Sequence, residues 1–249
     1  MPPPIPARRV IAVIQARTGS SRLPGKVLRP LGGRAVLDWV VRAGQSAAGV
    51  DDVVIATSTA PGDDPIVQVG ERLGVPVVRG SEDDVLSRFL TAVDEHPCDA
   101  VVRLTSDCPL LDPTLIAQTV ALWRADPTVD YAATTLVRSL PRGLDVEVAS
   151  VDALRRVATT ATGHHRTHVT SGLYTEPGDY RLTGVVVRPA ANDLRITLDT
   201  AEDAALIEAV VAELGDSPPA WRDLVALLRS RPDLVALNSA IEQKRLEEG

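Results

Sequence analysis

A short loop near the start of the chain concentrates positively charged side chains behind a buried strand. Residues 10–33 read V-I-A-V-I-Q-A-R-T-G-S-S-R-L-P-G-K-V-L-R-P-L-G-G, and the apolar run Val10–Ile14 is typical of a buried parallel strand. The loop that follows is rich in Gly, Ser and Pro, and carries Arg17, Arg22 and Lys26 before any acidic residue occurs. Small residues let a backbone approach a ligand, and cations with free N–H groups suit a polyphosphate. The pattern predicts a phosphate-binding loop; the alternative is a solvated basic loop.

Two aspartates follow predicted strands further along the chain. Asp107 comes shortly after the run Ala100–Thr105, and Asp199 directly after the run Leu194–Leu198. Burying a carboxylate just past a strand costs free energy unless the carboxylate has a partner. Mg²⁺ is a suitable partner, because proteins hold it through one or two carboxylates beside substrate phosphates. The positions predict a Mg²⁺ site made by Asp107 and Asp199. In the alternative reading, Asp107 caps a turn, and Asp199 or Thr200 caps the following helix.

Three familiar sites are not favoured by the sequence. A Walker loop requires Gly, four residues and then Gly-Lys-Ser/Thr, whereas Gly25-Lys26 has Ser20 at the first Gly position and Val27 after the lysine. The dinucleotide fingerprint G-x-G-x-x-G is absent. Two histidines four residues apart, at 164 and 168, lack the Glu of H-E-x-x-H that a zinc site of that type requires.

The loop resembles the A-R-x-x-S-x-R-L-P-x-K loop of the cytidylyltransferases that make CMP-activated sugars. Its form Q-A-R-x-G-S-S-R-L-P-G-K is closest to the spore-coat-polysaccharide-biosynthesis type, related to CMP-octulosonate and CMP-nonulosonate synthetases. Four more family segments follow in order: R-G-S-E-D-D-V-L-S-R-F from Arg79, R-x-T-x-D-C-P from Arg103, P-x-G-L-D-V-E-V from Pro141, and L-R-I-T-L-D-T-A-E-D from Leu194. The last resembles the family's L-R-x-T-V-D-T-x-E-D. The chain departs from the family's R-E-H-V-T segment, because Thr167 replaces Glu.

The resemblance implies a Mg²⁺-dependent cytidylyltransferase. Such an enzyme couples CTP to a small anionic acceptor, an acidic sugar or a phosphonate, and releases pyrophosphate. Three alternatives stay open: a nucleotidyltransferase that uses another nucleoside triphosphate, a glycosyltransferase of the same fold, and a catalytically idle nucleotide-binding protein. A glycosyltransferase usually shows D-x-D, and the nearest match is Asp145-Val146-Glu147.

The resemblance also implies the residues of the site. Catalytic roles are expected for Arg17, Lys26 and Asp107, and metal binding for Asp107 and Asp199. Nucleotide binding is expected at Gln15, Ala16, Arg17, Gly19, Ser20, Arg22, Lys26, Thr57, Arg79, Ser81 and Thr105. Acceptor binding is expected at Arg103, Asp145, Glu147, Arg166 and His168. Helix capping is the alternative role for Ser81, and exposure to water is the alternative for Asp145 and Glu147.

Alternating apolar strands and amphipathic helices predict a three-layer, doubly wound α/β fold with a mainly parallel sheet. Strands are predicted over 10–14, 52–56, 75–78, 100–105, 130–135, 180–188 and 194–198. Helices are predicted over 36–47, 65–73, 83–93, 113–123, 150–157, 163–174, 201–214 and 220–229. We expect residues 1–249 to form one nucleotidyltransferase domain, with a hairpin and helix insertion at about 135–190 that covers the substrate and forms a homodimer. Residues 241–249 are predicted to be a charged tail.

Composition limits the classes of binding partner and the cellular compartment that we expect for this protein. The net charge of -7 argues against a nucleic-acid partner, so local cations must attract an anionic substrate. Cys98 and Cys108 lack C-x-x-C spacing and indicate the reduced thiols of a cytoplasmic protein. No run approaches 18 apolar residues, so we expect no membrane segment.

Overall fold

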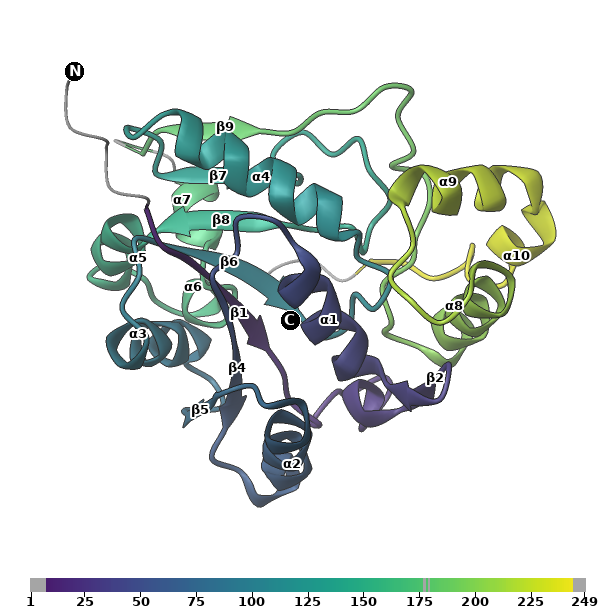
Figure 1. Cartoon of the computed structure of the whole chain (residues 1–249), viewed down its shortest axis with the longest axis horizontal. Coiled ribbons are helices and arrows are strands. Elements are labelled where there is room, and N and C mark those ends of the chain that lie inside the picture. Colours follow the sequence, from purple (N-terminus) through teal and green to yellow (C-terminus); the bar gives the residue numbers. More distant parts are fainter. Residues whose placement is uncertain (1–7, 177, 179, 244–249) are drawn as a thin grey trace.

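Seven strands form one sheet through the middle of the molecule (Figure 1). The computed structural model describes residues 8–176, 178 and 180–243. The strands are β1 Val10–Gln15, β4 Asp52–Ser58, β5 Val77–Gly80, β6 Ala100–Thr105, β7 Tyr131–Ala133, β8 Glu147–Ser150 and β9 Leu182–Gly184. Their order is β5-β4-β1-β6-β8-β7-β9. Four of the six strand pairs are parallel, and only β8 runs against its neighbours, which confirms the predicted mainly parallel sheet.

Helices cover both faces of this sheet. They are α1 Val36–Ser46, α2 Asp64–Leu73, α3 Val85–Glu95, α4 Pro113–Ala125, α5 Val151–Ala158, α6 His164–Thr167, α7 Ser171–Thr175, α8 Ala201–Leu214, α9 Trp221–Ser230 and α10 Pro232–Ala236. Side chains alternate along β1, so Val10, Ala12 and Ile14 join a core with α1, α2, α4 and α8. Ile11 and Val13 join the opposite core with α3, α5 and α7. Figure 1 shows α1 and α3 on opposite sides of β1, which confirms the three layers.

The register of β1 against β6 positions the loops that carry the predicted site. Gln15 pairs with Thr105 at the carboxyl ends of the two parallel strands. The Ser106 N–H then donates to the Gln15 carbonyl over 3.1 Å. Both loops therefore leave the sheet at the same edge, where doubly wound proteins bind ligands. After the first loop, a small two-stranded sheet of β2 (Pro30–Leu31) and β3 (Arg34–Ala35) leads into α1.

The strand predicted over 194–198 is wrong. The segment makes only an isolated bridge, between Arg142 and Arg195. Leu194, Ile196 and Leu198 are buried, as the alternating pattern requires, but their backbone groups bond to loops instead of a strand. An alternating sequence predicts which side chains are buried. It does not show whether a neighbouring strand is present to form the backbone hydrogen bonds of a sheet.

The single helix predicted over 163–174 is also wrong. The chain forms two short helices, α6 and α7, and between them Val169 adopts a left-handed backbone with φ 52°. Val169 is buried, and the Thr170 hydroxyl beside it donates to Glu147. Tertiary contacts at the break therefore outweigh the helical pattern. The break also removes the regular helix on which His164 and His168 would have met one metal.

Several further boundaries differ from the predictions. The stretch 135–190 supplies β8 and β9 to the main sheet, and residues 141–146 are irregular instead of forming a hairpin. Strand β5 begins two residues later than predicted, and α10 was not predicted. Helix α3 begins at Val85, because the Asp84 carboxylate accepts the Ser87 N–H and caps it. Of the predicted tail, residues 244–249 lie outside the described part of the chain.

Candidate active site

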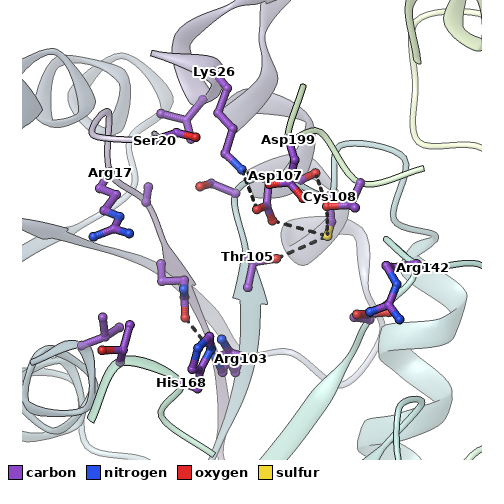
Figure 2. Close-up of a pocket in the computed structure, with 18 of the residues that line it drawn as sticks. Arg17, Ser20, Lys26, Arg103, Thr105, Asp107, Cys108, Arg142, His168 and Asp199 are labelled. Atoms are coloured by element: carbon purple, nitrogen blue, oxygen red, sulfur yellow. Dashed lines mark hydrogen bonds and ion pairs between the residues drawn. The ribbon is translucent and has the colours of Figure 1, made fainter. Parts of the chain in front are cut away.

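One cavity of about 520 Å³ opens at the edge where β1 and β6 end. It is lined by most of the residues predicted from the sequence, namely Gln15, Ala16, Arg17, Gly19, Ser20, Arg22, Lys26, Arg103, Thr105, Asp107, Asp145, Glu147, His168 and Asp199. Figure 2 shows side chains from both strand-end loops converging on this space. The loop cations and the two predicted aspartates therefore share one cavity, although they come from distant parts of the chain.

Lys26 lies between the two predicted aspartates (Figure 2). Its Nζ is 2.8 Å from Asp107 Oδ2 and 2.8 Å from Asp199 Oδ1. Gly25 makes this possible, because its left-handed backbone, with φ 71°, turns the loop into a short 3₁₀ helix that starts at Lys26. Lys26 is only 9% exposed, so it is not a solvated loop lysine.

Asp199 holds two further cations with its other oxygen. Asp199 Oδ2 lies 2.9 Å from Arg22 NH2 and 2.8 Å from Arg195 NH2. Arg195 is itself shared with the fully buried Asp203 on α8. Asp199 therefore lies at the centre of an ion cluster, with cations from the loop after β1 on one side and from its own segment on the other.

Lys26 and Asp107 stabilise each other's charged forms. Burial alone raises the pKa of a carboxyl group and lowers that of an ammonium group. At Asp107 burial is outweighed by the Lys26 charge together with hydrogen bonds, and the pKa falls to about 2. At Lys26, burial is outweighed in the same way by Asp107 and Asp199, which raise the pKa of the ammonium group. Both groups are therefore charged at neutral pH.

Thr200, and not Asp199, caps helix α8. The Asp203 N–H donates to Thr200 Oγ1 over 3.2 Å, and the Thr200 N–H donates to Asp203 Oδ2 over 3.1 Å. These reciprocal bonds form a capping box. The Asp199 oxygens point instead toward cations. Of the two explanations that the sequence left open for Asp199, capping is therefore wrong.

Asp107 and Asp199 are arranged to hold one cation between them. Each places an oxygen 2.8 Å from the same point, the Lys26 Nζ. Mg²⁺ takes oxygen ligands and is usually held by one or two carboxylates, with substrate phosphates and waters completing its shell. Within the described residues, no group of three His, Cys, Asp or Glu side chains could form a metal cage. The pair therefore fits a hard divalent cation that shares its shell with a phosphorylated substrate.

A buried ion pair forms part of the cavity wall. Glu147 Oε1 holds Arg103, and Glu147 Oε2 accepts hydrogen bonds from Tyr131 OH, over 2.8 Å, and from Thr170 Oγ1. Arg103 Nε also donates to Gln15 Oε1 over 3.0 Å. Glu147 is 7% exposed, so most of its hydrogen-bonding capacity is used inside the protein. This network connects β6, β7, β8 and the end of β1 in one wall of the cavity.

The far side of the cavity carries a second group of arginines. Arg138 holds Asp145 through two bonds of 2.7 and 3.0 Å. Arg142 is half-buried, lines the cavity and makes no ion pair with any residue from 8–176, 178 or 180–243. Burial, followed by the charge of Arg138, lowers the pKa of Arg142. Figure 2 shows Arg142 and Arg17 on opposite sides of the Lys26–Asp107 pair.

Comparison with known proteins agrees with this geometry. The family model for cytidylyltransferases matches residues 11–210. The chain is 35% identical over 233 residues to the spore coat polysaccharide biosynthesis protein SpsF of Bacillus subtilis, covering 90% of this chain and 95% of that protein. The chain belongs to the cytidylyltransferase family.

Two other similarities agree with membership of this family. The 3-deoxy-manno-octulosonate cytidylyltransferase of Bdellovibrio bacteriovorus is 32% identical over 126 residues, which cover 50% of this chain and 49% of that one. A solved cytidylyltransferase structure from Leptospira borgpetersenii matches with a TM-score of 0.89 and 26% identity, covering 95% of this chain and 100% of that one. The resemblance inferred from the five motifs is confirmed, and the protein is a nucleotidyltransferase. No helix in its described part has the length and apolar character to cross a membrane.

Four residues predicted at the site of this cytidylyltransferase lie outside the cavity. Thr57 is fully buried within β4, and Arg79 donates to two backbone carbonyls at the end of that strand. Ser81 Oγ accepts the Asp84 N–H, which fits the capping-type role that was its alternative. Arg166 is held by the Asp84 carboxylate. Arg79, Ser81 and Arg166 thus bond to neighbouring segments of the chain and do not line the cavity.

Arg88 and Arg138 line the cavity of the cytidylyltransferase but were not predicted. Arg88 could have been predicted from the sequence, because it lies between Val85 and Phe89 on the apolar, core-facing side of α3. Arginine is rare at buried positions, so its presence there suggests a functional role. Arg138 lies in an irregular segment, where no periodic pattern predicts which way its side chain points.

Proposed function

We propose that this cytidylyltransferase transfers CMP from CTP, with Mg²⁺, to a small anionic acceptor and releases pyrophosphate. The observation that carries the proposal is the placement of two converging carboxylates, Asp107 and Asp199, in one cavity, flanked by Arg17 and Arg142, which form no ion pair with the described residues. An acidic-sugar acceptor is supported by the names of the two curated relatives, a spore coat polysaccharide protein and an octulosonate cytidylyltransferase. A phosphonate acceptor has the same charge and would use the same cations.

The phosphate loop binds the triphosphate in this proposal. Arg17, Arg22 and Lys26 contact phosphate oxygens, and the small residues Gly19 and Ser20 let the backbone approach them. Lys26 exchanges a carboxylate partner for a phosphate oxygen when CTP arrives, since its ammonium now bonds to Asp107 and Asp199. Catalysis of phosphoryl transfer depends mainly on such positioning and on cationic stabilisation of the charge that develops.

Asp107 and Asp199 would hold Mg²⁺. When bound, the metal supplies positive charge at the α-phosphate and lowers the pKa of a sugar hydroxyl. Asp107 stays ionised at neutral pH, because its pKa lies near 2, and a group with so low a pKa is a poor general base. Asp107 therefore holds a cation and does not remove a proton.

The acceptor side is formed by Arg142, together with Arg103 and His168 on the cavity wall. Arg142 lacks a carboxylate partner in the described chain, so a carboxylate or phosphonate group can take that position with a bidentate guanidinium contact. An oxygen of the acceptor attacks the α-phosphorus of CTP in line, and pyrophosphate leaves. A phosphonate acceptor is already ionised and needs no base. A sugar acid must release its hydroxyl proton to solvent.

Pyrophosphate release tests the proposal. The purified protein is assayed with CTP, UTP, GTP and ATP, each with a 3-deoxy sugar acid, a phosphonate or a neutral sugar, in Mg²⁺ and in EDTA. We expect release only with CTP, Mg²⁺ and an anionic acceptor. Faster release with another nucleotide would make this a different nucleotidyltransferase, and faster release with the neutral sugar would refute the anionic acceptor. Sugar transfer from a nucleotide sugar, without pyrophosphate, would indicate a glycosyltransferase.

A matched pair of variants tests the acceptor side. Arg142→Met removes the unpaired guanidinium, whereas Arg42→Met removes an exposed arginine on α1, away from the cavity. We expect Arg142→Met to raise the acceptor KM at least tenfold without changing the affinity for CTP, and Arg42→Met to change neither. The homodimer and the cytoplasmic location expected from the sequence stay predictions, and sedimentation of the purified protein checks the first.

A further inference from the structure

Arg88 is a buried arginine on α3 that has no carboxylate partner among the described residues. It is 2% exposed, its NH1 lies 3.5 Å from the Ala56 carbonyl, and its Nε has no hydrogen-bond partner in the described structure. A buried charge is normally held by an opposite charge, because taking it out of water is costly. Arg88 lines the active-site cavity, so the charge that it lacks can come from a ligand.

The fold makes room for this arginine. Gly80 ends β5 directly beside the Arg88 stem, and a Cβ at that position would lie only 2.8 Å from Arg88 Cγ. A side chain at position 80 would therefore displace Arg88. Phe89, the next residue along α3, is fully buried and anchors the helix in the core. The position of the guanidinium is thus set by a strand and a packed helix, and not by a partner charge.

A second cation, Arg17, faces the same cavity without a carboxylate. Arg17 is exposed and makes no ion pair with the described part of the chain. Both guanidinium groups line one cavity, and burial, followed by the charge of Arg17, lowers the pKa of Arg88. Three acidic groups raise the pKa of Arg88, and none forms an ion pair with it in the described structure. Glu82 is exposed and lies beside Gly19 of the loop, and the other two are engaged elsewhere. Asp63 accepts hydrogen bonds from Ser58 and Thr18, and Asp84 pairs with Arg166.

The other cations of the cavity are already neutralised. The cluster around Lys26 balances three positive charges, on Arg22, Lys26 and Arg195, against three negative ones, on Asp107, Asp199 and Asp203. Arg103 is paired with Glu147, and Arg138 with Asp145. Among the described charged residues that line the cavity, the unbalanced ones are Arg17, Arg88 and Arg142. Arg142 lies across the Lys26–Asp107 pair from Arg17, on the acceptor side (Figure 2).

We propose that Arg17 and Arg88 together form a phosphate subsite for the nucleotide, distinct from the balanced Lys26 cluster. This inference rests on the proposed use of CTP and deepens it, because it assigns part of the triphosphate charge to a residue outside the phosphate loop. A phosphate group between two guanidinium groups satisfies donors that the protein leaves unused and removes their mutual repulsion. Arg88 is thus a binding residue whose charge costs stability until the nucleotide arrives.

The experiment compares Arg88→Met and Arg88→Lys with the exposed control Arg42→Met. Melting temperatures are measured without ligand, and Kd values by calorimetry for CTP, CMP, cytidine and inorganic pyrophosphate. Arg88→Met removes an uncompensated charge, so we expect it to melt at or above the wild-type temperature. We expect at least tenfold weaker binding of CTP and of pyrophosphate and less than a twofold change for cytidine. Arg88→Lys should recover part of the loss, and Arg42→Met should match the wild type.

Three results would overturn the subsite. Cytidine binding that weakens as much as CTP binding would place Arg88 against the base or ribose. A lower melting temperature with an unchanged Kd for CTP would make Arg88 a structural cation. An Arg17→Met, Arg88→Met double variant whose loss for pyrophosphate equals the sum of the single losses would mean that the two do not share one phosphate group. A different result would refute the proposed function alone. If the wild type binds CTP and pyrophosphate but releases no pyrophosphate from CTP, the proposed activity is wrong while the phosphate subsite is supported.

Discussion

The Leu198 N–H donates to the Asp107 carbonyl over 2.8 Å. This one backbone bond ties the end of the 194–198 segment to the loop after β6, and Asp199 is the next residue. The two acidic side chains are therefore held on either side of a fixed point, where Lys26 now lies. The bond fixes the backbone of the two aspartates in relative position. This is the rigidity that a shared cation site requires.

We predict that Asp107→Asn and Asp199→Asn each reduce turnover at least 100-fold, while the Kd for CTP changes less than fivefold. Each variant removes one negative charge that would hold the metal, but leaves the phosphate-binding arginines in place. The double variant should be hardly slower than either single one, because groups that act as a unit are not additive. Turnover and calorimetry are measured on all three.

Thr200→Val is the matched control for the variants of this acidic pair. It removes the cap of α8 beside Asp199 and should lower the free energy of unfolding by about 1 kcal/mol. Its turnover at low temperature should stay normal. If Asp199→Asn behaved like Thr200→Val, destabilised but active, Asp199 would have no part in metal binding.

Lys26→Met should lower stability and, at the same time, sharpen the response to Mg²⁺. The substitution leaves Asp107 and Asp199 facing each other without the ammonium between them, and removing one partner of a buried ion pair costs about 3 kcal/mol or more. Added Mg²⁺ can then occupy the vacated point. We expect Mg²⁺ to raise the melting temperature of Lys26→Met more than that of the wild type, in the absence of nucleotide. An equal or smaller rise would show that the two carboxylates do not bind the metal together.

The Lys26–Asp107 pair should stabilise the fold at neutral pH and fail in acid. The pKa of Asp107 falls from 3.8 to about 2 on folding. A lowered carboxyl pKa gives stability that is present above about pH 4 and is lost as the pH falls toward 2. Lys26 has a raised pKa, so its contribution is present below its unfolded value of 10.5 and is lost only above it. Across the intervening neutral range this contribution should be flat.

Asp107→Asn provides the measurement for this pH dependence. The difference in melting temperature between the wild type and this variant should be constant from about pH 5 to 9 and should shrink as the pH falls below about 4. A difference that is as large at pH 3 as at pH 7 would contradict the lowered pKa of Asp107.

Glu147→Gln should destabilise the protein because Glu147 neutralises Arg103 inside it. The amide can still accept from Tyr131 or Thr170, but the Arg103 guanidinium loses its opposite charge while it stays in the wall. We expect a melting temperature several degrees lower, with the acceptor KM and the Kd for CTP changed together through the displaced wall. An unchanged melting temperature with a higher acceptor KM would assign Glu147 to direct acceptor binding, as the sequence suggested.

Local sequence patterns predicted the elements of the site well. The apolar runs that precede Arg17 and Asp107 are strands whose ends meet at one edge of a parallel sheet, because adjacent strands in that sheet end side by side. Lys26 was predicted from its place in a loop of small residues and cations, and the shared site of Asp107 and Asp199 from their positions just past apolar runs. Each of these inferences needs only short-range periodicity or residue type, both of which are visible in the chain.

Charge pairing was decided by the tertiary structure alone. Arg88, Arg103 and Arg166 have the same side chain, yet Arg103 pairs with Glu147, Arg166 pairs with Asp84, and Arg88 pairs with no carboxylate in the described part of the chain. The two carboxylates come from elements 44 and 82 residues away along the chain from their arginines. Whether a guanidinium remains available to a ligand depends on which opposite charge packing brings within about 4 Å, and that distance is set by the whole fold.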